Sequence, residues 1–157
     1  MGPAAAANPR ACEGVKAMFR KILVAHDGSD GAWKAMAVAI DLARHYGAEI
    51  HLISVIEELP RYAATLDEVE EVHAEATRHY QAIQEAACRQ AERRGVKAYD
   101  KVVPGHEVQT IVHYAEQEQC DLLVVGRQGH SARWLKHLGS TSSQITFHAP
   151  CTIMVVA

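Results

Sequence analysis

The most informative stretch of this sequence is Lys21-Ile22-Leu23-Val24-Ala25-His26-Asp27-Gly28-Ser29. Its first part, residues 21–25, is a short run dominated by aliphatic side chains, which is typical of a strand buried on both faces of a parallel sheet. The remaining residues favour a turn, and Ser29 or Asp30 is a suitable N-cap for a helix. Apolar residues then recur at helical spacing to about Tyr46, and Gly47 follows as the expected C′ residue. The stretch therefore predicts a strand, a tight turn and a helix.

The same alternation of short apolar runs and long amphipathic segments continues to the end of the chain. The further strands are expected at 50–56, 98–103, 122–125 and 152–156, and the further helices at about 67–94, 106–119 and 140–147. Continuous Val, Ile and Leu runs favour strands that are covered by helices on both faces. The sequence therefore predicts the α/β class, with a single doubly wound, five-stranded, mainly parallel sheet and helices on both faces.

Length and charge restrict the classes of function. The 157 residues are enough for one domain with one hydrophobic core. The formal net charge of −3 argues against a protein that coats DNA or RNA, because such proteins neutralise many phosphates. The longest apolar runs are far shorter than the roughly 18 residues that a membrane span needs. We therefore expect neither nucleic acid nor a membrane among the partners.

The cysteines and the first residues bear on the compartment and on the domain boundaries. Four scattered cysteines without a C-x-x-C pair favour a reducing, cytoplasmic location. Residues 1–17 have no periodicity and lack the apolar region of a signal peptide. We interpret them as a disordered leader or a remnant of cloning, with Met18 as the expected start and 18–157 as the domain.

Two strand ends carry residues that suit a ligand, and in open parallel sheets ligands bind beyond the carboxyl ends of the strands. Asp27 follows the first strand, Gly126-Arg127-Gln128-Gly129 follows the fourth, and Gly139-Ser140-Thr141 opens the last helix. Glycines let the backbone approach an anion, and a helix N-terminus attracts it. Residues 126–140 contain three basic residues and no acidic one. The pattern fits a phosphate site, although the same glycines also fit plain turns and Ser140 a plain N-cap.

The remaining clusters carry weaker signals. Ten histidines include no H-x-x-x-H pair, so we expect no metal held by protein side chains alone. Residues 57–75 have a net charge of −6 and are interpreted as a solvated helix start, a docking surface or a lid. The last strand, 152–156, is almost free of charge. Because an exposed apolar edge strand tends to pair, we expect it to pair antiparallel with its copy in a twofold dimer.

The glycine spacing Gly126-x2-Gly129-x9-Gly139-Ser140 matches the G-x2-G-x9-G-[ST] motif of the nucleotide-binding branch of the universal stress protein family. Residues 22–29 resemble the opening of that family, and His148-Ala149-Pro150-Cys151 resembles its close. The resemblance covers nearly all of 18–157. His26 stands where a small or apolar residue is more usual, and Arg127 stands where Ser or Thr is common.

The resemblance implies ATP binding, the strand order 3-2-1-4-5 and a homodimer. Asp27 would face the ribose or metal side of the nucleotide, and Val55 would offer backbone groups to the adenine. The implied phosphate side comprises Gly126, Arg127, Gly129, Gly139, Ser140 and Thr141. Mg²⁺ would be held mostly by phosphate oxygens and water, as this ion prefers.

Catalysis is a separate question, because phosphoryl transfer also needs a group that orients the nucleophile. His130 and Asp27 are the candidates for that role, while Arg127, Arg133 and Lys136 can stabilise charge. We therefore predict a nucleotide-responsive stress or signalling module, with a slow ATPase or autophosphorylating nucleotide hydrolase of the same fold as the alternative.

Other α/β folds fit the sequence less well. The S-G-G-x-D-S loop of the related pyrophosphatases is missing after the first strand. Val103-Pro104-Gly105 stands where a phosphorylation receiver needs its Asp. A flavodoxin-like carrier would bind a flavin and be yellow, so the colour of the purified protein tests this alternative.

Overall fold

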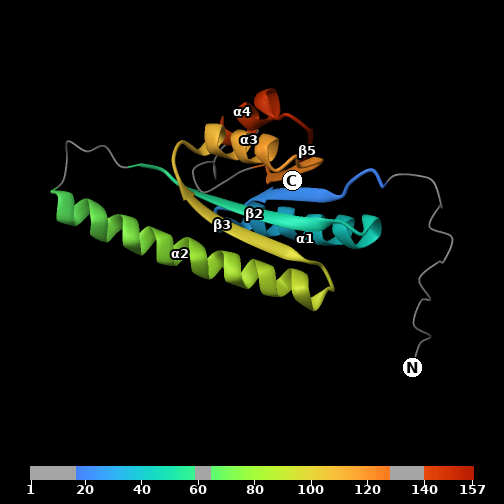
Figure 1. Cartoon of the computed structure of the whole chain (residues 1–157), viewed down its shortest axis with the longest axis horizontal. Helices are drawn as coiled ribbons and strands as arrows, with labels where there is room; N and C mark the ends of the chain where they lie inside the picture. The colour runs from blue at the N-terminus through green and yellow to red at the C-terminus, as the bar shows by residue number, and fades with distance from the viewer. Residues whose placement is uncertain (1–16, 59–64, 128–139) are drawn as a thin grey trace.

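The computed structural model describes residues 17–58, 65–127 and 140–157. Strands and helices alternate along the chain (Figure 1): β1 (Lys21–Ala25), α1 (Asp30–Tyr46), β2 (Glu49–Ile56), α2 (Leu66–Arg93), β3 (Ala98–Pro104), α3 (Glu107–Gln117), β4 (Leu122–Gly126), α4 (Ser140–His148) and β5 (Thr152–Val156). Every expected element is present, and its boundaries differ from the prediction by two residues at most.

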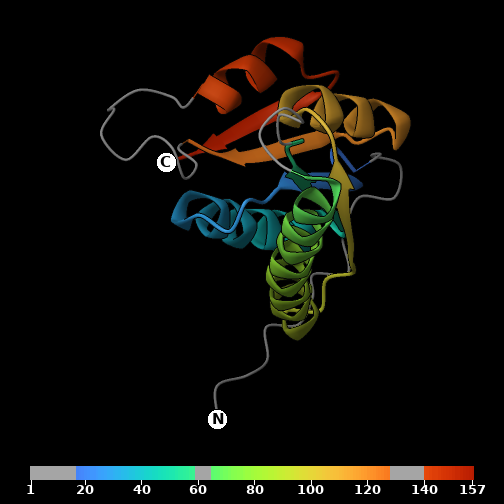
Figure 2. The ribbon, with the colours of Figure 1, turned by 90° about the vertical axis from the view of Figure 1, so that its left-hand side faces the viewer.

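The five strands form one parallel sheet in the order β3-β2-β1-β4-β5. The chain begins in the middle of the sheet, runs outward to β3 and returns to β4 on the other side of β1. Helices α1 and α2 cover one face, and α3 and α4 cover the other (Figure 2). The predicted doubly wound α/β fold and the strand order 3-2-1-4-5 are confirmed.

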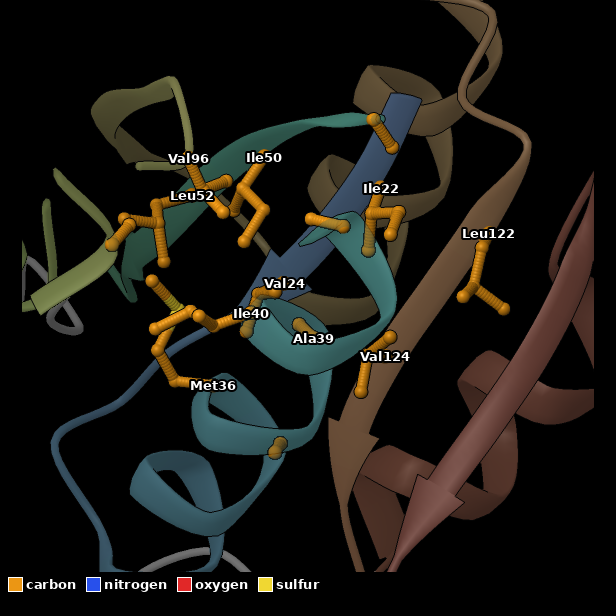
Figure 3. Close-up of a cluster of buried hydrophobic side chains, with 14 of the residues drawn as sticks. Ile22, Val24, Met36, Ala39, Ile40, Ile50, Leu52, Val96, Leu122 and Val124 are labelled. Atoms are coloured by element: carbon orange, nitrogen blue, oxygen red, sulfur yellow. The ribbon is translucent and has the colours of Figure 1, made fainter. Parts of the chain in front are cut away.

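The two faces of the sheet carry separate hydrophobic clusters, because side chains alternate along a strand. Ile22 and Val24 of β1 pack with Met36 and Ile40 of α1 on one face (Figure 3), while Leu23 belongs to the cluster on the α3 side. All three β1 side chains are fully buried. Burial on both faces explains why this strand reads as a continuous apolar run.

The start of α1 is fixed against the ends of β1 and β4. Ser29 is the N-cap, and its side chain accepts a hydrogen bond of 3.2 Å from the Ala32 N–H. A Cβ atom added at Gly126 would lie 2.6 Å from the backbone carbonyl carbon of Gly31. The last residue of β4 therefore touches the backbone of the first turn of α1, and only glycine fits this close approach.

A buried polar cluster lies between the sheet and the α1/α2 layer. His26 is 2% exposed, and its ring stands edge-on to Trp33 of α1 at a centroid distance of 4.5 Å. Its Nδ1 accepts a 3.1 Å hydrogen bond from the Gly28 N–H, so the neutral ring carries its proton on Nε2. The Gln84 amide of α2 donates to Ser54 Oγ at 2.8 Å, and Ser54 Oγ donates to the His26 carbonyl at 2.7 Å. The His26 ring is thus part of the core on the α1 side.

Burial of His26 makes the free energy of unfolding sensitive to acid. Burial lowers the pKa of His26 from 6.5 to about 4, and the charge of Asp27 opposes part of that shift. The folded state favours the neutral ring, so the stabilisation is complete above pH 6.5 and is lost as the pH falls from 6.5 towards 4. The full effect is about 3 kcal/mol, since one pKa unit corresponds to about 1.4 kcal/mol.

Urea unfolding across this pH range tests the prediction with His26→Gln. The variant should lose most of the acid sensitivity in this window, whatever its stability at neutral pH. His113→Gln, at an exposed position on α3, is the matched control and should keep it. An unchanged pH slope in His26→Gln would contradict the assignment.

Candidate functional site

The predicted site residues come together at the carboxyl edge of the sheet. β1 and β4 are neighbours in register, with Val24 opposite Val124, so the turn after β1 and the end of β4 lie side by side. Ser142 Oγ donates a 2.8 Å hydrogen bond to the Gly126 carbonyl, which holds the first turn of α4 at the end of β4. The edge therefore combines the Asp27 turn, Gly126 and the Ser140-Thr141 start of α4.

Asp27 lies in a turn that fixes its carboxylate. Its Oδ1 accepts a hydrogen bond of 2.9 Å from the Ser29 N–H, two residues further along the chain. This is the local side-chain-to-backbone contact for which Asp is favoured in turns. The side chain is half-buried and lies beside the N-terminus of α1.

Glu107 is a site residue that the sequence analysis missed. It is the first residue of α3, and its Oε2 accepts a 3.3 Å hydrogen bond from the Thr141 hydroxyl of α4. Burial raises the pKa of Glu107, and the negative charge of Asp27 raises it further. An acidic residue in the first turn of a helix is common in any sequence, so the pattern alone gave no reason to select it.

Carboxylates gather on the β1–β3 side of this edge. Burial raises the pKa of Tyr80 on α2, and the charges of Asp27, Glu107 and Glu57 raise it in that order. Glu57 directly follows β2, so these groups come from the ends of two strands and the start of α3. The start of α4 adjoins this group, because the Thr141 hydroxyl donates to Glu107, and Ser140 adds a further hydroxyl there.

Of the remaining predicted residues, the structure describes Val55 and Arg127. Val55 is half-buried near the end of β2 and packs against the cluster on the α3 side. Arg127 is exposed, and its backbone N–H donates to the Val156 carbonyl at 2.8 Å, so this N–H is already used. Gly129 and Gly139 lie outside the described residues, as do the charge-stabilising candidates Arg133 and Lys136 and the water-orienting candidate His130.

The described residues contain neither a side-chain cluster for a metal ion nor a membrane-spanning helix. Within the ranges 17–58, 65–127 and 140–157, no group of three or more His, Cys, Asp or Glu side chains is arranged to hold a metal ion. No helix in that part of the chain is long and apolar enough to cross a membrane.

Solved structures of nucleotide complexes share this fold. A universal stress protein in complex with cAMP has a TM-score of 0.68 and 21% identity, covering 89% of this chain and 98% of the other. The universal stress protein from Archaeoglobus fulgidus in complex with dAMP has a TM-score of 0.62 and 20% identity, covering 89% of this chain and 99% of the other. At these identities the likeness concerns the fold.

Closer matches identify the family. The structure of universal stress protein UspA from Lactobacillus plantarum has a TM-score of 0.83 and 25% identity, covering 88% of this chain and 98% of the other. A universal stress protein of Thermus aquaticus is 32% identical over 150 residues, which covers 88% of this chain and 99% of the relative. The model of the universal stress protein family matches residues 18–157. The chain therefore belongs to the universal stress protein family.

Proposed function

We propose that this protein is an ATP-binding stress or signalling module, in which the nucleotide occupies the carboxyl edge of the sheet between β1 and β4. The observation that carries the proposal is the meeting of the Asp27 turn, Gly126 and the start of α4 at the point where the strand order reverses. Crevices of this kind are the usual ligand sites of doubly wound sheets. The cAMP and dAMP complexes of proteins with the same fold support an adenine nucleotide.

The polar groups at this edge favour one orientation of the proposed nucleotide. Ribose hydroxyls are donors and suit the carboxylate of Asp27, while the adenine would lie against the backbone at Val55. The phosphates would lie at Gly126, Arg127 and the start of α4, where Ser140 and Thr141 contribute the first backbone N–H groups of the helix and Ser140 adds a hydroxyl. Gly129 and Gly139 complete the proposed phosphate side, on the strength of their spacing in the sequence.

The same charges favour Mg²⁺–ATP over the free nucleotide. Asp27, Glu57 and Glu107 place negative charge near the crevice, which disfavours a polyphosphate that brings no cation. Mg²⁺ is usually bound by one or two carboxylates together with phosphates and water, and these side chains fit that donor set. Bound Mg²⁺ would neutralise phosphate charge, while Thr141 keeps the Glu107 carboxylate in place through its hydrogen bond.

We also propose a homodimer formed through β5. Within the described residues β5 pairs with β4 on one side only, and Ile153, Met154, Val155 and Val156 are only partly buried. Antiparallel pairing with a second copy would satisfy the open backbone groups and cover this apolar edge.

Binding of ATP–Mg²⁺ should depend on Ser140 but not on a neighbouring serine of the same helix. Loss of one hydroxyl that bonds a charged phosphate should raise the Kd of Ser140→Ala by about tenfold, as measured by calorimetric titration. Ser143→Ala makes the same chemical change further along α4 and should bind like the unmodified protein. Equal affinities for all three proteins, or no detectable ATP binding to any of them, would count against the proposal.

Glu107→Gln should reduce the dependence on Mg²⁺. The amide oxygen can still accept from Thr141, so the change removes charge while keeping the contact. Affinity for ATP in the presence of a chelator should rise several-fold, because one repulsive charge is gone, while affinity for ATP–Mg²⁺ should change less. Glu116→Gln, an exposed position of α3, controls for the change in net charge. An unchanged or lower affinity for metal-free ATP in Glu107→Gln would be the contrary result.

The proposed dimer predicts that a charge on β5 separates the two copies. Val155 is partly exposed on the α3 side of β5, so Val155→Glu would place a carboxylate beside the strand that becomes covered in the dimer. The variant should sediment as a monomer at micromolar concentration where the unmodified protein sediments as a dimer. The circular dichroism spectrum of the variant controls for loss of the fold. A monomeric unmodified protein, or a folded variant that remains dimeric, would show that β5 does not form the interface.

A further inference from the structure

The opposite edge of the sheet contains a cavity that the proposed nucleotide site does not use. Its volume is about 510 Å³, and it lies where α1 and α2 end and where β2 and β3 begin. These four ends occupy the same side of the molecule, at the right of Figure 1. The residues of the proposed nucleotide site lie at the far ends of the strands.

Positive charge dominates the lining of this cavity. Arg20, Arg44, Arg94 and Lys97 are the cationic lining residues, and Glu49 is the acidic one. The Glu49 carboxylate is already engaged, because its Oε1 lies 2.9 Å from His51 Nε2 and 3.9 Å from Lys21 Nζ.

Only one of the four cations has an acidic partner in the described part of the chain. Arg94 Nη2 lies 2.8 Å from Asp41 Oδ1. Between residues 17–58, 65–127 and 140–157, no ion pair joins Arg20, Arg44 or Lys97 to a carboxylate. The cavity therefore holds positive charge that these residues do not balance.

Helix stabilisation explains only part of this charge. Arg44 lies in the last turn of α1 and Arg94 is the C-cap residue of α2, where cations interact favourably with the helix dipole. Arg20 precedes β1 and Lys97 precedes β3, so neither is at a helix end. Three segments of the chain thus direct four cationic residues to one cavity, with Arg94 and Lys97 on the same connection, and the helix dipole accounts for two of the four.

The backbone N–H groups of the two turns beside the cavity are already hydrogen-bonded, so side chains would have to bind a ligand there. The N–H groups of Gly47 and Ala48 donate to the Ala43 carbonyl, and those of Gly95 and Val96 donate to the Glu92 and Ala91 carbonyls. Apart from each glycine and its two chain neighbours, no atom of the described residues lies within 4 Å of a Cβ built at Gly47 or Gly95, so both positions border open space. A ligand here would meet guanidinium and ammonium groups, with room beside the two glycines.

We propose that this cavity is a second ligand site, which binds a small anion carrying at least two phosphate groups. Guanidinium groups match phosphate oxygens with paired hydrogen bonds, and several cations in one cavity favour a multiply charged ligand over orthophosphate. The site is independent of the proposed ATP site, because the two lie at opposite ends of the same strands.

An NMR titration of the ¹⁵N-labelled full chain with pyrophosphate, in low salt and without Mg²⁺, tests this site directly. The amide signals of Gly47, Gly95 and Lys97 should shift, and orthophosphate should bind more weakly. The double variant Arg44→Gln, Lys97→Gln should weaken the binding of pyrophosphate by about tenfold or more. The matched control is Lys34→Gln, Arg78→Gln, which removes two exposed cations from α1 and α2 outside the cavity and should bind normally.

Three results would overturn the proposal. One is the absence of shifts at Gly47 and Gly95 at millimolar pyrophosphate. Another is a set of shifts confined to Gly28 and Gly126, which would place the anion at the other edge. The third is equal weakening by the two double variants, which would indicate general surface attraction. Ser140→Ala should leave the shifts at Gly47 and Gly95 intact, so failure of the proposed ATP site and failure of this site are distinguishable.

Discussion

The central position of β1 is the constraint on which the rest of the structure depends. β1 pairs with β2 on one side and with β4 on the other, and helices cover both of its faces. Because the first strand occupies the middle, the chain must run outward to β3 and then return to β4 across the sheet. Helices α1 and α4, which follow β1 and β4, therefore cover opposite faces, and the strand order reverses between these two strand ends. The contact of Gly126 with Gly31 holds the start of α1 against the end of β4 at this point.

The helices and strands could be predicted from the sequence because buried parallel strands and amphipathic helices have distinct periodicities. The strand order came from the family resemblance, since periodicity does not say which strands are neighbours. Alternation along β1 could have placed His26 on the same face as Ile22 and Val24, where the structure has it. Glu107 could not be selected in this way, because its role depends on a contact with Thr141 that lies 34 residues away in the sequence. The amphipathic pattern over 67–94 correctly predicted α2 but not how far it packs on the sheet, since Val72 near its start is 46% exposed. The 28 residues of α2 span about 42 Å, whereas the seven residues of β3 span about 23 Å, so α2 extends beyond the sheet (Figure 1).

The two edges of the sheet have opposite electrostatic character that a net charge of −3 conceals. Carboxylates of Asp27, Glu57 and Glu107 gather near the ends of the strands, whereas Arg20, Arg44 and Lys97 line the cavity near their starts. The first edge suits a nucleotide that brings a cation, and the second suits an anion without one. One fold thus provides two surfaces of opposite charge.

The most direct measurement of the central claim is a crystal structure of the full chain grown with ATP and Mg²⁺. We predict density for the adenine beside the end of β2, with the phosphates at Gly126 and at the first turn of α4. Density for the nucleotide at another surface, or a carboxyl edge that stays empty when ATP–Mg²⁺ is saturating, would contradict it.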